Sequence, residues 1–242
     1  MEVCLVCVVH DPNAHNIDFI RRAVPTLRSA YSAMYITVSD ETAKDVLIEL
    51  ERGGFATQVV PKAGAANARQ DALRLASTTS FGYFHYCDLD RMLTWVLNYP
   101  NELRQIKDEI IKYDYTILGR TERAFRTHPE SWVKTEAITN HICSLELGFE
   151  VDITAGSCGF SSNSLHLILQ HSVSKMTDAE WAMIVRRIGK GSVGYREVEG
   201  LEYVEDINGR PSSTQLDANS WLGRLRLSYL ISASAISTGN EF

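Results

Sequence analysis

The sequence predicts an α/β fold with a mostly parallel central sheet. Short β-branched apolar runs alternate with segments of helical periodicity along the chain, and the first run, VCLVCVV at 3–9, is apolar at every position. A continuous apolar run of this length is typical of a strand that is buried on both faces of a parallel sheet. Strands that alternate with helices build such sheets through right-handed crossovers, and ligands then bind beyond the carboxyl ends of the strands.

The first half of the chain repeats the strand and helix pattern. After the polar DPNAHN loop, apolar residues recur at helical spacing from Ile17 to Leu27. The elements predicted next are a strand at 33–39, a helix at 42–52, a strand at 55–60, a helix at 65–76 and a strand that starts at 81. Asp11, Asp40 and Asp88 each follow a predicted strand, so we expect them at one edge of the sheet.

The second half is less regular. Its predicted elements are a helix that Pro100 opens, a strand at 115–119, a basic polar loop at 120–134, a helix at 135–147, a glycine turn within 152–162, two short helices, an edge strand within 198–206 and a helix at 220–236. The last helix is apolar on several faces, so we expect it to pack on its own domain, a second subunit or, less favourably, a membrane surface. We treat residues 1–242 as one domain with a first half (1–92), a second half (93–200) and a C-terminal helical segment (213–242).

Composition indicates a soluble globular protein. The 242 residues are 45% hydrophobic and carry a net charge of −6, so no overall basic field attracts nucleic acid. No stretch has the length of a membrane span, and the apolar N-terminal run lacks the basic start of a signal peptide. We therefore expect a cytoplasmic protein. Its five scattered cysteines indicate thiols, and Cys4 and Cys7 are expected on opposite faces of a strand, where they share no metal.

Two carboxylates, Asp88 and Asp90, end the aromatic run FGYFHYCDLDRM at 81–92. In a strand they would share one face, with their roots about 6 to 7 Å apart. Two anions at the end of a buried strand repel each other, and a divalent cation or a proton relieves that repulsion. The alternative is that the aspartates simply follow their preference for strand ends and helix starts.

Four motifs in order resemble the GT-A fold of nucleotide-sugar glycosyltransferases, and family 2 of these enzymes is the nearest likeness. VCLVCVVHDPNAHN resembles their first strand and loop, MYITVSDET their second strand with its acidic end, AGAANARQDALRLA their Gly-rich loop and Ala-Arg-Asn-x-Gly helix start, and FGYFHYCDLDRM their metal-binding Asp-x-Asp. Gln70 and Ala72 stand where that family has Asn and Gly. The likeness covers the first 90 residues well and the stretch to about 190 loosely. It implies a GT-A-like, Rossmann-like three-layer sandwich.

The resemblance implies roles for several residues. Asp88 and Asp90 would hold Mg²⁺ or Mn²⁺ together with the diphosphate of a nucleotide sugar, and Asp90 would be the direct ligand. Asp40 would accept a hydrogen bond from the base, Asp11 would lie beside the nucleoside and Arg69 would contact the nucleotide. The basic loop offers Arg120, Arg123, Arg126 and His128 to phosphates or to an anionic acceptor, unless it is only a solvated surface.

The segment TDAEWAMIV at 177–185 stands where these enzymes carry an acidic pair. The resemblance makes Asp178 the general base, with Glu180 as the second choice. The same acids also suit the start of a helix. Trp181 could stack on a sugar ring or lie in the core.

Taken together, the sequence predicts a metal-dependent, inverting glycosyltransferase that uses a nucleoside diphosphate sugar and an unidentified acceptor. Two alternatives stay open. One is a sugar-phosphate nucleotidyltransferase, although the HDPNAHN loop has neither the glycine nor the lysine of a phosphate loop. The other is a non-catalytic nucleotide-binding module of the same fold.

Overall fold

The computed structural model describes residues 2–209 and 217–240. The strands in these residues are β1 (Val3–Val9), β2 (Met34–Ser39), β3 (Ala56–Val60), β4 (Tyr83–Cys87), β5 (Tyr115–Arg120), β6 (Ser157–Ser161) and β7 (Val193–Val198). The helices are α1 (Ile17–Ala30), α2 (Lys44–Arg52), α3 (Ala65–Ser77), α4 (Leu89–Asn98), α5 (Pro100–Ile110), α6 (Glu122–Arg126), α7 (Glu130–Leu147), α8 (Ser162–His171), α9 (Glu180–Met183), the π-helix η1 (Ile184–Ile188), α10 (Glu205–Asn208) and α11 (Ala218–Ser237).

All of these strands form one sheet in the order β3-β2-β1-β4-β6-β5-β7. Strand β6 pairs antiparallel with β4 and β5, and every other pairing is parallel. The mostly parallel sheet predicted from the sequence is therefore confirmed. The carboxyl ends of β1, β2 and β4 meet at one edge, and because β6 runs the opposite way, its first residues lie at that edge too.

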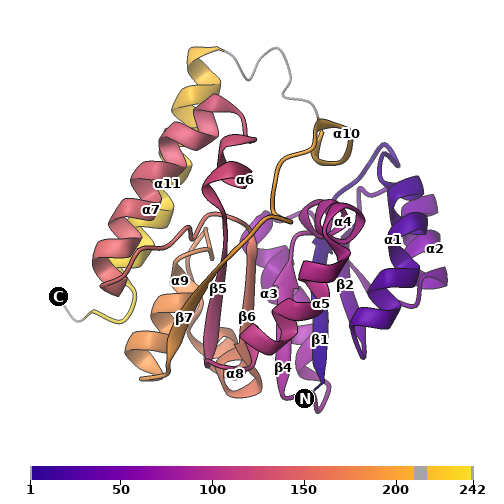
Figure 1. Cartoon of the computed structure of the whole chain (residues 1–242), viewed down its shortest axis with the longest axis horizontal. Coiled ribbons are helices and arrows are strands. Elements are labelled where there is room, and N and C mark those ends of the chain that lie inside the picture. The colour runs from indigo at the N-terminus through magenta and orange to yellow at the C-terminus, as the bar shows by residue number, and fades with distance from the viewer. Residues whose placement is uncertain (1, 210–216, 241–242) are drawn as a thin grey trace.

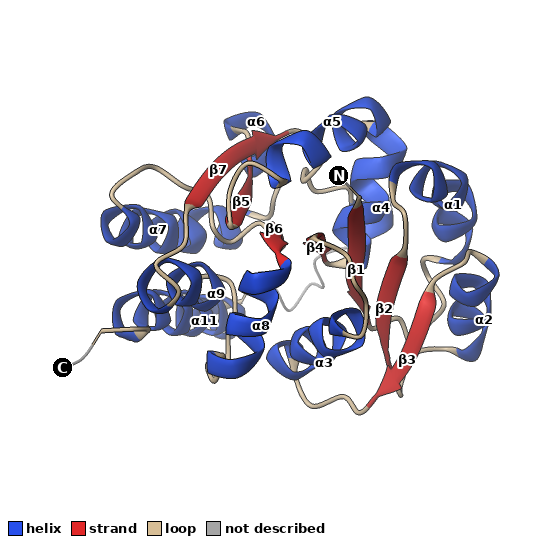
Figure 2. Cartoon of the chain, turned by 90° about the horizontal axis from the view of Figure 1, so that it is seen from below, coloured by secondary structure: helices blue, strands red, loops and turns tan. Residues whose placement is uncertain are grey.

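Helices cover both faces of the sheet, which makes three layers (Figures 1 and 2). Helices α1, α2, α4 and α5 pack on one face, whereas α3, α8 and α9 pack on the other. Each face of the sheet has its own hydrophobic core. Side chains of β1 alternate between them, so that Cys7 lies in one core and Cys4 in the other. The two cysteines thus lie on opposite faces, as predicted. None of the helices in 2–209 and 217–240 is long and apolar enough to cross a membrane.

Several sequence predictions were wrong in detail. Helix α4 was not predicted. The strand was expected to continue through Asp88 and Asp90, but β4 ends at Cys87 and α4 begins at Leu89. The predicted loop at 120–134 instead contains α6 and the start of α7, and Thr121 caps α6 by accepting from the N–H of Ala124. The predicted edge strand at 198–206 is a turn followed by α10. The edge strand in this half of the sheet is β7, which ends at Val198.

Helices α7 and α11 lie side by side at the left of Figure 1. The Ser228 hydroxyl of α11 bonds the hydroxyl of Thr139 and the carbonyl of Thr135 on α7, which draws the two helices together. Both helices also expose apolar side chains among polar ones. Leu222, Leu225, Tyr229 and Ile236 of α11 are exposed, as are Ile138 and Leu145 of α7. The predicted C-terminal helix is thus present, although residues 213–216 and 241–242 of the predicted segment lie outside the described residues.

The homo-oligomer expected through this helix stays a prediction. We expect Leu225→Glu combined with Tyr229→Glu to convert a dimer into a monomer, because charges replace apolar side chains that are 51% and 70% exposed. Light scattering measures the change. Val173→Glu is the control, since Val173 is 89% exposed but lies outside α7 and α11. A wild-type chain that is already monomeric at all concentrations would contradict the prediction.

Candidate active site

Asp88 and Asp90 lie at the carboxyl end of β4, but not on one strand face as predicted. Asp88 is the N-cap residue of α4 and Asp90 lies in the first turn of that helix. The strand-based spacing argument was therefore wrong. The helix nevertheless brings both carboxylates to the walls of the same two cavities.

The first of these, the β1–α3 cavity, has a volume of about 340 Å³. The second, the α7–α11 cavity, has a volume of about 240 Å³. The residues shared by both walls are Arg69, Asp88 and Asp90. The site therefore consists of two compartments that meet at one charged cluster.

Arg69 connects the two halves of this cluster. Its Nη2 donates to Oδ2 of Asp88 at 3.0 Å, and its Nη1 donates to Oδ2 of Asp178 at 3.0 Å and to the Thr177 hydroxyl at 2.9 Å. Burial by itself would lower the pKa of Arg69, but the charges of Asp88 and Asp178 raise it well above its usual value. Its Nε is buried without a hydrogen-bond partner in the described part of the chain.

Two further residues shape the surroundings of Asp88. The buried Tyr86 hydroxyl donates to Oδ1 of Asp88, so protein donors hold both oxygens of this carboxylate. Gly156, just before β6, has φ of +75° and its carbonyl accepts from the N–H of Asp88. A Cβ atom at Gly156 would lie 3.0 Å from Oδ2 of Asp88, so glycine leaves this carboxylate open on that side.

Asp178 and Glu180 have different surroundings. Asp178 lines the α7–α11 cavity, and no side-chain cap bond is formed at the start of α9, where Ala179 is the N-cap residue. The helix-cap explanation for Asp178 is therefore wrong. Glu180 is 1% exposed and accepts from the N–H groups of Val173 and Ser174 and from the Ser172 hydroxyl. Glu180 thus holds a loop, which argues against its use as a base.

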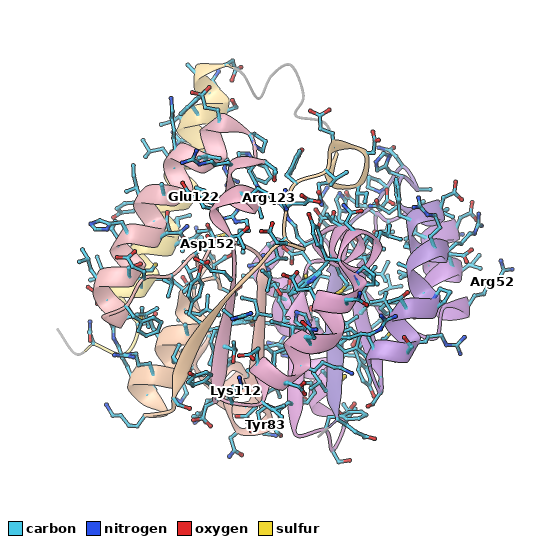
Figure 3. All side chains as sticks on the ribbon, viewed as in Figure 1. Arg52, Tyr83, Lys112, Glu122, Arg123 and Asp152 are labelled. Carbon is cyan, nitrogen blue, oxygen red and sulfur yellow. The ribbon has the colours of Figure 1, made fainter. Side chains whose placement is uncertain are left out.

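Trp181 and the basic residues of 120–134 also differ from expectation. Trp181 is a core residue, 2% exposed, so stacking on a sugar is excluded. Arg123 of α6, labelled in Figure 3, pairs with Glu199 and Glu202 and donates to the Tyr99 hydroxyl, outside both cavities. Arg126 pairs with Glu122 on the exposed side of α6. None of these three residues lines the β1–α3 cavity or the α7–α11 cavity.

Arg120 was predicted to contact the nucleotide, but it is a buried structural residue. It donates to Asp152 through N, Nε and Nη2 at 2.7 to 2.8 Å and to Glu136 through Nη2 at 2.8 Å. Burial opposes the charge on Asp152, yet the charge and hydrogen bonds of Arg120 hold the pKa of Asp152 below its usual range. Two protein carboxylates thus occupy the guanidinium that the sequence offered to a ligand.

Replacing Asp152 with asparagine is expected to lower the free energy of unfolding by about 3 kcal/mol at neutral pH, because Arg120 loses a buried partner charge. Urea unfolding measures this loss. Since the folded pKa of Asp152 is depressed, its contribution is present above the ordinary aspartate pKa of about 4 and is lost as pH falls through the lower folded value. Glu122→Gln, in an exposed pair, is the control and should change stability little. Equal stability of both variants would contradict this role.

Asp11 and Asp40 lie at the expected sheet edge, but neither lines the β1–α3 cavity. Asp11 is buried and accepts from the backbone N–H groups of His15 and Asn16, so it orders the loop before α1. Asp40 is exposed and accepts from the N–H of Lys62. The neighbour of Asp40, Ser39, lines the cavity instead.

The α7–α11 cavity has a wall that the sequence did not reveal. The guanidinium carbon of Arg91 lies 5.7 and 5.6 Å from the ring centres of Trp132 and Tyr203, which are in edge contact with each other at 5.9 Å. Arg224 of α11 also stacks on Trp132, with its guanidinium carbon 4.2 Å from the ring centre, and pairs with the buried Glu136. Burial lowers the pKa of Arg224, whose Nε also lacks a partner in the described residues.

His128, which the sequence offered to phosphates or to an anionic acceptor, instead supports this wall. Its Nδ1 donates to the carbonyl of Ala124 at 3.1 Å, so its Nε2 accepts from Nη1 of Arg91 at 3.1 Å. Burial, together with the charges of Arg120 and Arg91, lowers the pKa of His128 to about 2. A neutral histidine therefore holds Arg91 in place.

The donor set fits a hard divalent cation. Asp88 and Asp90 provide carboxylate oxygens, which Mg²⁺ and Mn²⁺ prefer, and Gly156 leaves room at Asp88. In the described residues, no group of three or more His, Cys, Asp or Glu side chains could hold a metal ion. A cation here would therefore use these two residues together with oxygens of a bound ligand and water, as Mg²⁺ usually does.

No protein-family model matches the sequence. No curated protein matches it either. Solved structures do match the chain over almost its whole length, at low sequence identity.

Three of these are structures of glucosyl-3-phosphoglycerate synthase from Mycobacterium tuberculosis. The complex with Mn²⁺, UDP and phosphoglyceric acid is 13% identical with a TM-score of 0.64, over 99% of this chain and 78% of that one. The complex with Mn²⁺, UDP-glucose and phosphoglyceric acid is 15% identical with a TM-score of 0.65, over 98% and 79%. The complex with Mg²⁺ and UDP is 14% identical with a TM-score of 0.62, over 100% and 80%. Together with the sheet order, this likeness confirms the GT-A-like fold predicted from the sequence resemblance.

Proposed function

We propose that this protein is a metal-dependent glycosyltransferase that transfers a sugar from a nucleoside diphosphate sugar to a hydroxyl group of a small acceptor, with inversion at the sugar carbon. One observation carries the proposal: Asp88 and Asp90 line both the β1–α3 cavity and the α7–α11 cavity. A donor in the first cavity and an acceptor in the second would meet at the same two carboxylates. The fold shared with a synthase solved with UDP-glucose supports this arrangement.

The β1–α3 cavity suits the nucleotide. Its wall is largely apolar, with Val8, Val60 and Pro61 to contact a nucleoside and Lys62 and Arg69 to offer positive charge. Held by Asp88 and Asp90, Mg²⁺ or Mn²⁺ would supply positive charge that stabilises the departing diphosphate. Asp40 stays our candidate for recognition of the base, through the oxygen that Lys62 does not engage.

Asp178 is the candidate general base. Its side chain is 7% exposed and lines the α7–α11 cavity, and Arg69 holds its Oδ2. Within the described residues, no donor hydrogen-bonds Oδ1, which can therefore take the proton of an acceptor hydroxyl. Arg69 keeps the carboxylate in the orientation that this proton transfer needs.

The acceptor is proposed to carry an anionic group as well as the reacting hydroxyl. Arg91 and Arg224 lie in the wall of the α7–α11 cavity, and Nε of Arg224 has no partner among the described residues. The structurally similar synthase was solved with phosphoglyceric acid, which has both groups. Recognition of an anion by a guanidinium is strong and directional.

The experiment is a matrix of UDP-, GDP- and CDP-glucose against 3-phosphoglycerate, glycerate and glycerol, with Mn²⁺ or with a chelator. We expect release of UDP only with Mn²⁺ and an anionic acceptor. In a separate reaction, release of pyrophosphate from UTP and glucose 1-phosphate would instead identify a nucleotidyltransferase, because the sugar phosphate then displaces pyrophosphate from the triphosphate. Thermal stabilisation by UDP without turnover on any acceptor would favour a non-catalytic module, since a bound ligand raises the melting temperature.

A further inference from the structure

The chain after β7 returns to the site and contacts two consecutive residues of α4. The ring of Tyr203 lies 5.6 Å from the guanidinium carbon of Arg91, and the amide of Asn208 contacts Asp90. In Figure 1, α10, which ends at Asn208, lies above α4. This segment therefore supports α4 at the point where its first turn meets the cavities.

The neighbours of Asn208 determine how its amide is oriented. Its Oδ1 accepts from the N–H of Val204 at 2.8 Å and from the Thr94 hydroxyl at 3.2 Å. Its Nδ2 therefore faces Asp90 and donates to Oδ2 at 3.0 Å. A flipped amide would lose both acceptor bonds and would place an oxygen against a carboxylate, so only one orientation satisfies the network.

The amide restricts a carboxylate that is otherwise loosely held. The side chain of Asp90 is 36% exposed, and its nearest cation, Nε of Arg91, is 3.9 Å away. By contrast, Asp88 has both oxygens held, by Tyr86 and Arg69. In the described part of the chain no donor hydrogen-bonds Oδ1 of Asp90, so this oxygen is the one available to a ligand.

We propose that Asn208 is a positioning residue that holds Asp90 by one oxygen so that the other can bind a divalent cation. This proposal rests on the proposed function, since it assumes the cation site at Asp88 and Asp90. Groups that hold a metal ligand by a hydrogen bond typically change metal affinity by about 10 to 100 fold when removed. Asn208 is expected to act at the lower end of this range, because Asp90 is partly exposed.

The test is a calorimetric titration of Mn²⁺ into the protein saturated with UDP, without any turnover. We expect Asn208→Leu to weaken Mn²⁺ binding by about tenfold. Asn98→Leu is the matched control: Asn98 lies on α4, the helix of Asp90, and its amide also donates to a carboxylate, Glu202, at 3.0 Å, but Asn98 lines neither cavity. Unchanged Mn²⁺ affinity in Asn208→Leu would overturn the proposal.

Asn208→Asp tests whether position 208 faces the cation site. The new carboxylate keeps the acceptor for Val204 and Thr94 but turns its second oxygen towards Oδ2 of Asp90. Repulsion between the two carboxylates should lower the melting temperature of the metal-free protein. Because a bound cation relieves this repulsion, Mn²⁺ with UDP should raise the melting temperature by more than in the wild type. A metal-induced rise equal to that of the wild type would mean that position 208 does not face the cation site, which would overturn the proposal.

The outcome for Asp90→Ala distinguishes the two levels of inference. If this variant keeps wild-type Mn²⁺ affinity, the cation site and with it the proposed function are wrong. If it loses Mn²⁺ affinity while Asn208→Leu does not, the cation site stands and only the role of Asn208 is wrong.

Discussion

Replacing Asp90 with alanine is expected to remove Mn²⁺-dependent UDP binding and, with it, turnover. Asp90 lines both cavities and has an oxygen that no described residue engages, so it is the better direct ligand of the two aspartates. Loss of one of the two proposed ligands should weaken binding of the cation by about a hundredfold, the upper end of what removal of a supporting group costs. Calorimetry with UDP and Mn²⁺ measures the change.

The control for this variant is Asp108→Asn, which changes an exposed acid on α5, outside both cavities. It should bind UDP and Mn²⁺ like the wild type. A metal-dependent affinity that survives in Asp90→Ala would mean that the cation binds elsewhere.

Asp178→Asn is expected to lower kcat by about 10² to 10⁴ fold with little effect on donor binding. Asparagine has the same shape and can still accept from Arg69, but it cannot take a proton. The effect should therefore fall on the chemical step, which rapid-quench or steady-state kinetics on the identified substrates would detect.

Thr177→Val is the matched control for Asp178. It removes the other acceptor of Arg69 Nη1 and leaves the carboxylate of Asp178 intact. If the two variants lose turnover equally, Asp178 acts by holding Arg69 and is not the base. Near wild-type turnover in Asp178→Asn would also contradict the assignment.

The local pattern of the chain was sufficient for much of the first half. The apolar run of β1 and the helical spacing after it identified β1 and α1, and Pro100 correctly marked the start of α5. These features are local because strand and helix periodicity repeat within a few residues. The pair Asp88 and Asp90 was also recognised as belonging to a site, although by a strand geometry that β4 does not have.

The charged residues show where local pattern fails. Arg120 and Arg123 have similar sequence surroundings, yet Arg120 is 3% exposed at the end of β5 and Arg123 pairs with Glu199 and Glu202 outside the cavities. Burial of an arginine requires partner carboxylates, and those of Arg120 come from α7 and from Asp152. The sequence does not indicate which acids these are, because their approach depends on how the helices pack.

The sequence by itself therefore determined the alternation of strands and helices, the mostly parallel sheet and the aspartates at its edge. Only the tertiary structure decided what the acids of the site contact. Arg69 bonds Asp178, 109 residues away in the sequence, and Asn208 bonds Asp90, 118 residues away. Periodicity reports which face of an element is buried, over a few residues. A hydrogen bond between distant side chains depends on the position and rotation of both elements, and these are set by the packing of the whole core.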